Sequence, residues 1–508
     1  MADSKREIER KYEATAETRL PDLGRAAGVA AVDHRGTDEL DAVYYDTADL
    51  RLAADALTLR RRTGGGDAGW HLKFPVASGI RDELREPLSD TLPRSLAGLL
   101  RSRVRRSELV PVVRLRTTRD VHHLLDADGA LLAEASVDTV RADRLTGTGG
   151  TAGWTEIEVE LADDGDPALL DAVERLLRKA GVLPSALPSK LARALAETAP
   201  EGQRKRDEGE ETPHPTAGDH VLAYLRRQTE AIVALDPAVR RDLPDSVHQM
   251  RVATRRLRSA LRTYRKVLDR NVTDPVGDEL KWLAAELGVD RDQEVLGARL
   301  RSGLDELPRT LLLGPVRGRL RIWSVARSGG SRRRTVAVLD GKRYLALLES
   351  LDTLLAAPPL LPAASHTPER ALPRAVLKDY ERLATRVGHA LDLPPGHARD
   401  LALHDARKAA KRARYAAEAA RPALGKPAKR IAERMKAVQS LLGDHQDSVV
   451  ARDALRALAV QAHAAGEPTF TWGLLYGREE AAAADREREL PHVWKRASGP
   501  RLTAALRG

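Results

Sequence analysis

The chain of 508 residues contains no cysteine. Disulfides and thiolate chemistry are therefore excluded, which fits a reducing compartment such as the cytoplasm. Any metal must be held by oxygen or imidazole ligands, and this favours hard cations such as Mg²⁺ or Mn²⁺. Aromatic residues make up only 3% of the sequence, so the hydrophobic cores must be built mainly from Leu, Val and Ala.

Long hydrophobic runs are also missing. No uninterrupted apolar stretch reaches about 18 residues, so no membrane span is expected. The first residues, MADSKREIER, are charged where a signal peptide would need an apolar stretch. We therefore expect a cytoplasmic protein without a membrane partner.

Charge is unevenly distributed along the chain, whose formal net charge is +10. Residues 1–200 hold 29 Lys and Arg against 34 Asp and Glu, whereas the remaining residues hold 55 against 40. An acidic first part and a basic second part indicate different tasks. The basic part is suited to a polyanion such as nucleic acid or polyphosphate.

The length predicts two or three domains. In residues 1–196, strand-like runs with period-2 patterning alternate with turn signals, and helical stretches occur near 14–28, 90–106 and 166–181; this predicts an α+β domain with a largely antiparallel sheet. Residues 197–217 have almost no apolar content and predict a flexible linker. Residues 218–508 have helical periodicity rich in Ala, Leu and Arg.

The helical region repeats itself. The segment VHQMRVATRRLRSALRTYRKVL (247–268) aligns with LHDARKAAKRARYAAEAARPAL (403–424). Further along, LGVDRDQEV (287–295) aligns with LGDHQDSVV (442–450), which pairs Gly288 with Gly443 and Asp292 with Asp447. We therefore predict two homologous helical bundles, over about 218–360 and 370–500.

One face of the repeated helix is almost entirely basic. At 100° per residue, the basic side chains of the first copy lie on one side, opposite Met250, Leu257 and Leu261. A charged helix face is usually only solvated, but the same stripe in both copies favours a bound polyanion. The stripe consists of His248, Arg251, Arg255, Arg258, Arg262 and Arg265 in the first copy and of His404, Arg407, Lys411 and Arg414 in the second.

These paired His-containing basic helices resemble the CHAD domain, the conserved histidine α-helical domain, over about residues 218–500. The resemblance implies two pseudosymmetric bundles whose basic faces bind inorganic polyphosphate. The implied polyphosphate-binding residues are His248, Arg251, Arg255, Arg258, Arg262, His404, Arg407, Lys411 and Arg414. Nucleic acid is the competing ligand, but no stacking aromatics interleave with the stripe and the DNA-reading signatures are missing.

In the first region, charged residues recur two apart, so that they share one face of a predicted strand. A half-buried sheet with one wet side would also alternate in this way. Here, however, acid-rich and base-rich strands are separate, which suits a divalent cation and a phosphate-rich anion. The acidic pairs are Glu7 with Glu9 and Glu156 with Glu158; the basic pairs are Arg60 with Arg62 and Arg114 with Arg116; Lys73 and Arg81 with Glu83 follow the same spacing.

The ordered series of Glu7-x-Glu9-x-Lys11, Arg60, Lys73, Arg81-x-Glu83, Asp138, Glu156-x-Glu158 and Lys190 resembles the CYTH superfamily, the triphosphate tunnel metalloenzymes. The resemblance covers about residues 5–195 and implies eight antiparallel strands that close into a tunnel with a charged interior. The implied ligands of Mg²⁺ or Mn²⁺ are Glu7, Glu9, Glu83, Asp138, Glu156 and Glu158. The implied triphosphate-binding residues are Lys11, Arg60, Arg62, Lys73, Arg81, Arg114, Arg116 and Lys190, and the implied catalytic set is Glu7, Glu9, Lys11, Glu156 and Glu158.

The resemblances together imply a multidomain inorganic triphosphatase whose partners are tripolyphosphate and polyphosphate, with polyphosphate granules as its surroundings. One alternative is a non-catalytic polyphosphate-binding or granule-associated protein. Another is a CYTH enzyme that acts on thiamine triphosphate or nucleoside triphosphates, including an adenylate cyclase. Such enzymes should present base-stacking aromatics at the tunnel mouth, where the candidates are Trp70, Phe74 and Trp154. The sequence predicts neither the oligomeric state nor the orientation of the domains.

Overall fold

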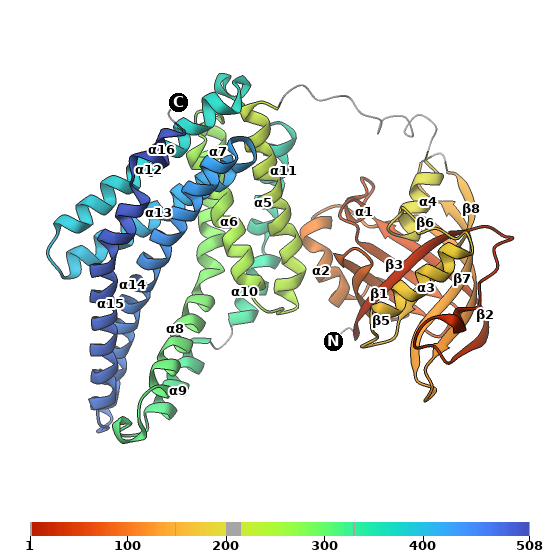
Figure 1. The fold of residues 1–508 in the computed structure, drawn as a ribbon, viewed down its shortest axis with the longest axis horizontal. Helices are drawn as coiled ribbons and strands as arrows, with labels where there is room; N and C mark the ends of the chain where they lie inside the picture. The colour runs from red at the N-terminus through yellow and green to blue at the C-terminus, as the bar shows by residue number, and fades with distance from the viewer. Residues whose placement is uncertain (1–2, 148, 200–214, 329–330, 507–508) are drawn as a thin grey trace. The chain divides into compact units, whose positions relative to one another are not determined.

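The computed structural model describes residues 3–147, 149–199, 215–328 and 331–506 (Figure 1). It divides into two compact units, Met1–Glu211 and Thr212–Gly508. This division falls inside the predicted linker 197–217, of which residues 200–214 lie outside the described residues.

The first unit is a closed antiparallel barrel with the strand order β1-β5-β4-β3-β2-β6-β7-β8. Figure 1 shows these strands wrapped by short helices. The predicted eight-stranded antiparallel tunnel is confirmed. The strands are β1 (Asp3–Ala14), β2 (Ala31–Asp46), β3 (Thr58–Thr63), β4 (Gly69–Ala77), β5 (Ile80–Pro87), β6 (Val110–Leu125), β7 (Leu131–Arg144) and β8 (Thr151–Leu161).

The hydrophobic cores of this unit lie outside the barrel wall, between strands and helices. Helix α3 buries Leu169, Val173 and Leu177 against Ile157 and Val159 of β8. A strand alternates its side chains between two faces, so an outer face that packs under helices leaves the other face for the interior. The helices of this unit are α1 (Arg51–Ala54), α2 (Arg94–Val104), α3 (Ala168–Lys179) and α4 (Lys190–Glu197), with a 3₁₀ turn η1 (Leu23–Arg25).

Two of the three helices predicted in this region are confirmed, as α2 and α3. The prediction of a helix over 14–28 is wrong, because only η1 forms there. Asp22 accepts a hydrogen bond from the backbone N–H of Gly24, and Gly28 adopts a φ of 93° that helices do not allow. Local turn chemistry therefore overrides the apolar spacing.

The second unit is all-helical, as predicted. No helix in the described ranges combines the length and the apolar character that a membrane crossing requires. The helices are α5 (Ala217–Arg240), α6 (Ser246–Thr263), α7 (Arg270–Glu286), α8 (Gly288–Asp305), α9 (Val316–Ser328), α10 (Ser331–Asp340), α11 (Lys342–Ala356), α12 (Pro368–Asp392), α13 (His397–Leu424), α14 (Lys426–Ala464), α15 (Phe470–Ala497) and α16 (Pro500–Ala504), with 3₁₀ turns η2 (Arg309–Leu311) and η3 (Pro362–Ser365).

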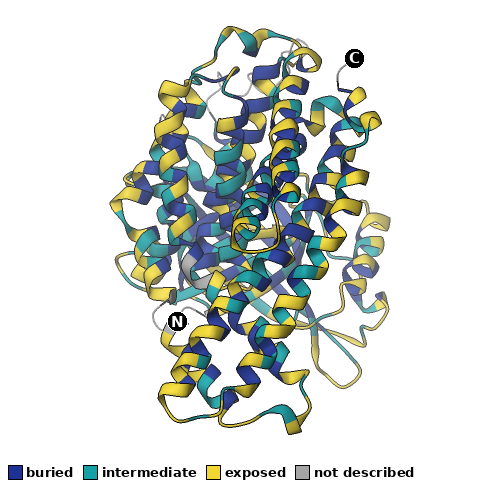
Figure 2. Cartoon of the chain, turned by 90° about the vertical axis from the view of Figure 1, so that its left-hand side faces the viewer, coloured by how far each residue is buried: buried dark blue, intermediate teal, exposed yellow. Residues whose placement is uncertain are grey.

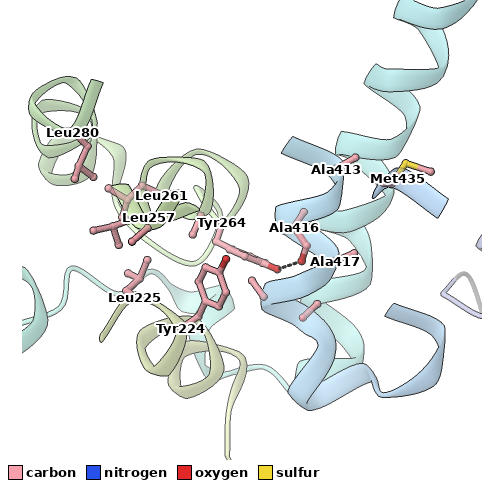
Figure 3. Close-up of a cluster of buried hydrophobic side chains, with 14 of the residues drawn as sticks. Tyr224, Leu225, Leu257, Leu261, Tyr264, Leu280, Ala413, Ala416, Ala417 and Met435 are labelled. Carbon is pink, nitrogen blue, oxygen red and sulfur yellow. Dashed lines mark hydrogen bonds between the residues drawn. The ribbon is translucent and has the colours of Figure 1, made fainter. Parts of the chain in front are cut away.

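Both repeats contribute to one hydrophobic core (Figure 3). Leu257 and Leu261 of α6 face the same interior as Ala413 of α13 and Met435 of α14. The Tyr264 hydroxyl donates a hydrogen bond of 2.9 Å to the backbone carbonyl of Ala416, so the end of the first basic helix is tied to the second. Figure 2 shows buried stripes alternating with exposed ones along the helices, as amphipathic packing requires.

Candidate functional site

The barrel encloses a cavity of about 440 Å³ that is lined mostly by charged side chains. Its basic lining residues are Lys5, Lys11, Arg35, Arg60, Arg62, Lys73, Arg81, Arg85, Arg119 and Lys190, and its acidic ones are Glu7, Glu9, Asp38, Asp67, Glu134, Glu158 and Glu160. The strand order explains how the two signs are separated. The acid-bearing strands β7, β8 and β1 are neighbours, and so are the base-bearing strands β5, β4 and β3. An acidic wall therefore faces a basic wall across the cavity.

Three of the predicted metal ligands converge on the acidic wall. One carboxylate oxygen each of Asp138, Glu156 and Glu158 lies within 4.8 Å of the others. Asp138 and Glu156 are opposite each other in the β7–β8 register. The exposed fractions of Asp138, Glu156 and Glu158 are 0%, 4% and 9%, so all three residues are buried. An all-oxygen set of this kind fits Mg²⁺ or Mn²⁺. The donor chemistry of the site therefore agrees with the metal that the resemblance implies.

Lysine and arginine side chains compensate this carboxylate cluster. The Lys190 Nζ, at the start of α4, lies 2.8 Å from Asp138, 2.7 Å from Glu156 and 2.5 Å from Glu158. Burial alone would lower the pKa of Lys190, but the charges of Asp138 and Glu158 raise it above its usual range. Burial likewise opposes ionisation of Glu158, yet the Lys11 and Lys190 charges hold its pKa well below the usual range. Glu158 and Lys190 are therefore both ionised at neutral pH.

The other predicted acids divide between two places. Glu9 is linked to this cluster through Lys11, whose Nζ lies 3.1 Å from Glu9 and also contacts Glu158. Glu7 and Glu83 lie instead around Lys73, at 2.6 and 3.4 Å. Burial raises the pKa of Glu7 to about 7. The structure thus brings the six predicted metal ligands together as two carboxylate groups rather than one.

The basic wall carries four of the predicted anion-binding residues, and all four line the cavity: Arg60, Arg62, Lys73 and Arg81. Burial alone would lower the pKa of Arg60, but the neighbouring Tyr44 and Glu83 raise it above its usual range. Around Arg62, burial and the charge of Arg60 act together and lower its pKa to about 9. A bound polyanion would relieve this concentration of positive charge.

The predictions for Arg114 and Arg116 are wrong, because neither residue lines the cavity. Arg114 pairs with Asp41, and Arg116 pairs with Asp143 at 3.0 Å, with exposed side-chain fractions of 44% and 49%. Along β6 the odd-numbered residues 117, 119 and 121 face inward, whereas Arg114 lies on the outer face; a β-strand turns alternate residues to opposite sides. Arg116 shares that outer face.

The same alternation gives the cavity Arg119, which the sequence analysis missed. Arg119 donates to Asp138 at 2.8 and 2.6 Å and to Glu158 at 2.6 Å. It stands directly opposite Asp138 in the β6–β7 register. Asp138 is a predicted inward acid, and residues opposite each other on neighbouring strands share a face of the sheet. The β6–β7 register would therefore identify Arg119 as an inward residue. Lys5, Arg35 and Arg85 also line the cavity and were missed.

Replacing Lys190 by Met should lower the stability of the barrel in EDTA, by about 3–5 kcal/mol, because three carboxylates would lose their shared cation. Mg²⁺ should then raise the melting temperature of the variant more than that of the native chain, since the metal can replace the missing charge. Thermal denaturation with EDTA and with Mg²⁺ measures both effects. Equal Mg²⁺ responses in the two proteins would show that the cluster does not bind the metal.

In the helical unit, the two basic stripes meet where α6 and α13 pack together. Burial and the charges of Arg407 and Arg255 lower the pKa of Lys411 to about 7. Burial and the nearby Arg251 and Arg407 likewise lower the pKa of Arg255. We call Arg251, Arg255, Arg407 and Lys411 the central basic cluster. Its positive charges are close enough to disfavour one another.

Residues at matched positions of the sequence repeat contact this cluster. Arg251 pairs with Asp292 at 3.0 Å, and its guanidinium lies beside Gly288, where a Cβ would come within 3.0 Å. In the second copy a Cβ at Gly443 would lie 3.6 Å from Arg407. Gly288 therefore leaves room for Arg251, whereas a Cβ at Gly443 would only touch Arg407 at an ordinary van der Waals distance.

The remaining stripe residues have other surroundings. Arg414 pairs with Glu418 at 3.1 Å and stacks on Tyr415. His248 and His404 are half-buried, and burial lowers the pKa of His404. Arg262 lines a second cavity of about 360 Å³, and burial together with the charge of Arg262 lowers the pKa of Arg258. That cavity is lined by Arg262, Arg265, Arg270, Arg382 and Arg412 together with Asp274 and Asp278. Arg270, Arg382 and Arg412 lie off the stripe, so helix periodicity could not find them.

Comparisons with known proteins agree with both units. The CYTH domain model matches residues 5–195 and the CHAD domain model matches residues 223–456. The uncharacterized proteins MT2285 and Rv2226 of two Mycobacterium tuberculosis strains are each 40% identical to this chain over an alignment of 502 residues, gaps included, that covers 95% of this chain and 94% of theirs.

Among solved structures, PptA from Streptomyces chartreusis has 21% identity and a TM-score of 0.48, covering 55% of this chain and 99% of its own. The CHAD domain from Ricinus communis has 25% identity and a TM-score of 0.44, covering 58% of this chain and 93% of its own.

A barrel with opposed acidic and basic inner walls, followed by a helical unit with a repeated basic helix, defines a two-domain protein of the tunnel-barrel class. The chain belongs to the family in which a CYTH domain is fused to a CHAD domain.

Proposed function

We propose that this protein is a metal-dependent inorganic triphosphatase that hydrolyses tripolyphosphate to pyrophosphate and phosphate. The observation that carries the proposal is the cavity in which an all-carboxylate cluster faces a wall of arginine and lysine side chains. Carboxylates add nothing to anion binding unless they hold a cation, so this combination favours phosphoryl transfer over simple storage of the anion.

The side chains of the cavity have separable tasks in this reaction. Arg60, Arg62 and Arg81 would bind the phosphate oxygens and hold the substrate along the basic wall. Asp138, Glu156 and Glu158 would hold Mg²⁺ or Mn²⁺, with Glu9 beside them. When bound, the metal supplies positive charge against the phosphate oxygens.

In the reaction itself, water attacks the terminal phosphorus, the P–O bond to the bridging oxygen breaks, and pyrophosphate leaves. The water proton passes to a cavity carboxylate. Glu7, whose pKa burial raises to about 7, can accept a proton near neutral pH. Lys11 and Lys73 would stabilise negative charge on the transferring group, because both ammonium groups lie inside the cavity.

The aromatic side chains favour an inorganic substrate. Trp70 and Phe74 are buried in the core between the barrel and α2, and Trp154 is buried in another core, so none of the three can stack on a base or a thiazole ring in the cavity. Among the described lining residues, Tyr44 is the one Phe, Tyr or Trp, and its hydroxyl accepts a hydrogen bond from Arg60. This argues against thiamine triphosphate and nucleoside triphosphates.

We further propose that the helical unit binds long-chain polyphosphate through the central basic cluster and that the protein acts in the cytoplasm close to polyphosphate granules. The supporting observation is the convergence of four cations where α6 and α13 meet, with Asp292 and Asp447 as nearby acids. A polyphosphate chain would supply the missing negative charge.

Polyphosphate binding should take up protons at pH 8. Free Lys411 has a pKa of about 7 because of burial and the neighbouring arginines, so it is mostly neutral at pH 8. A bound polyanion favours the protonated ammonium and raises this pKa, so binding consumes a proton and strengthens as the pH falls from 9 to 7. Calorimetry in buffers of different ionisation enthalpy measures the uptake, and Lys411→Met should abolish it. Unchanged uptake in that variant would exclude this explanation.

The substrate class can be tested by phosphate release from tripolyphosphate, ATP, thiamine triphosphate and long-chain polyphosphate in parallel, with Mg²⁺, Mn²⁺ or EDTA. The proposal predicts rapid, metal-dependent cleavage of tripolyphosphate and much slower cleavage of ATP and thiamine triphosphate. Faster turnover of either organic triphosphate would replace the proposal with the corresponding nucleotide or thiamine enzyme.

A further inference from the structure

A cluster of two histidines and one aspartate lies on the outer face of the barrel, away from the cavity lining. His34 belongs to β2, and Asp120 and His122 belong to β6. The His34 Nε2 lies 2.5 Å from one oxygen of Asp120, and the His122 Nε2 lies 3.1 Å from the other. The three ligand atoms all lie within 4.8 Å of one another.

A β-bulge brings His34 to this outer face. Gly36, Asp38 and Leu40 line the cavity, so simple alternation would turn His34 inward as well. The β2–β6 register shifts between His34 and Gly36, and Arg35 lines the cavity instead. Gly36 adopts a φ of 103°, which favours glycine over residues with a Cβ. Bulges commonly re-aim a side chain in this manner.

The partner strand presents its two ligands from the same face. His122 stands opposite His34 in the register, and Asp120 precedes it by two residues. Their neighbours Val121 and His123 line the cavity, which leaves Asp120 and His122 outside. The exposed side-chain fractions of His34, Asp120 and His122 are 58%, 42% and 19%, so an ion from solvent can reach the cluster.

Asp120 also differs from the acids of the two other described clusters of metal-ligating side chains. In the cavity cluster, Lys190 pairs with each acid, and in the Asp400, His445 and Glu487 cluster, arginines pair with the two acids. Of the residues that the structure describes, only His34 and His122 form ion pairs with Asp120. The nearest arginine along β2, Arg35, pairs with Asp33 at 3.0 Å. No described cation therefore competes for this carboxylate.

We propose that His34, Asp120 and His122 form a binding site for a borderline divalent transition metal ion such as Zn²⁺. Two imidazole nitrogens and a carboxylate oxygen are typical ligands of such ions, whereas Mg²⁺ prefers oxygen ligands alone. Both Nε2 atoms already point at the carboxylate. An ion can bind both Nε2 atoms when the single proton of each neutral imidazole is on Nδ1. Water completes the coordination.

The ion would join β2 to β6 beside the bulge that carries Arg35 into the cavity. It would therefore stabilise the folded barrel and fix the segment from which Arg35 extends. This site is independent of the cavity chemistry proposed above, since it shares no residue with the cavity lining.

The test is a Zn²⁺ titration of the EDTA-treated full chain in excess Mg²⁺, with a chromophoric zinc chelator as competitor. We expect one Zn²⁺ per chain, and His34→Gln, His122→Gln and Asp120→Asn should each weaken binding at least tenfold. The matched control is His123→Gln, the next residue on β6, which faces the cavity and should leave the affinity unchanged. Zn²⁺ affinity that is equal in the native chain and in the His34 and His122 variants would overturn the proposal.

A second readout separates this site from the two other clusters. With one equivalent of Cu²⁺, electron spin echo modulation counts the imidazole ligands: this site offers two, the Asp400, His445 and Glu487 cluster offers one, and the cavity cluster offers none. Two coupled imidazoles, reduced to one in His34→Gln, support the proposal. One or none in the native chain would overturn it, whatever the folding of the variants.

Discussion

Replacing Glu158 by Gln should reduce the rate of tripolyphosphate hydrolysis by at least about a hundredfold. Three cations of the cavity contact Glu158, namely Lys11, Arg119 and Lys190. The substitution keeps the size of the side chain but removes the negative charge, and with it one ligand for the metal and the counter-charge of three cations. Steady-state phosphate release with saturating Mg²⁺ measures the loss.

The control for this variant comes from the outer face of the same barrel. Arg116→Gln removes a charge that pairs with Asp143 outside the cavity, so kcat/KM should stay within about twofold of the native value, as surface substitutions usually change little. Near-native activity of the Glu158 variant, with its fold intact by circular dichroism, would contradict the assignment of the acidic wall as the metal site.

The double replacement of Arg251 and Arg407 by Ala should weaken polyphosphate binding by roughly a hundredfold or more, because each charge-assisted contact contributes about 1.5–3 kcal/mol. The two arginines occupy equivalent positions in the repeat, each beside a matched glycine, and they belong to one cluster rather than to two separate faces. The salt dependence of binding should also become shallower, since fewer cations meet the polymer. Titration of the full chain with labelled polyphosphate at several ionic strengths measures both quantities.

Lys408→Ala is the matched control, because Lys408 follows Arg407 on α13 but is exposed and pairs with Asp405. It removes one positive charge from the same helix outside the central basic cluster and should change the affinity less than threefold. An equal loss in this control and in the double variant would mean that net charge, and no particular cluster, attracts the polymer. RNA that competes as well as polyphosphate would favour a general polyanion surface.

The sequence predicted the strands of the barrel well because charged residues two apart mark a face, and the acids at 7, 9, 156 and 158 mark the inner one. The sequence did not predict which face of a strand points inward where no acidic pair marks that face. On β6, Arg114 and Arg116 share a face, and Arg119 takes the other. Only the pairing of Arg119 with Asp138 across β6 and β7 decides which arginine points inward.

Helix periodicity succeeded and failed in a related way. It placed Met250, Leu257 and Leu261 in the core, where they are buried, and it placed the basic stripe opposite them. It could not show that Arg251 and Lys411 approach one another, because that proximity depends on how α6 packs against α13. It also could not show that the residues of the stripe have different surroundings: Arg262 lines a separate cavity with Arg382 of α12. Contacts between helices are set by tertiary packing, which no single helix encodes.

The most direct test of the central claim is a ³¹P NMR time course of tripolyphosphate with the purified full chain, in Mg²⁺ and in EDTA. The claim predicts equal amounts of pyrophosphate and phosphate with Mg²⁺ and no reaction in EDTA. Intact tripolyphosphate in both samples, from a chain that still binds polyphosphate, would contradict it and would make the barrel a holder of the anion rather than an enzyme.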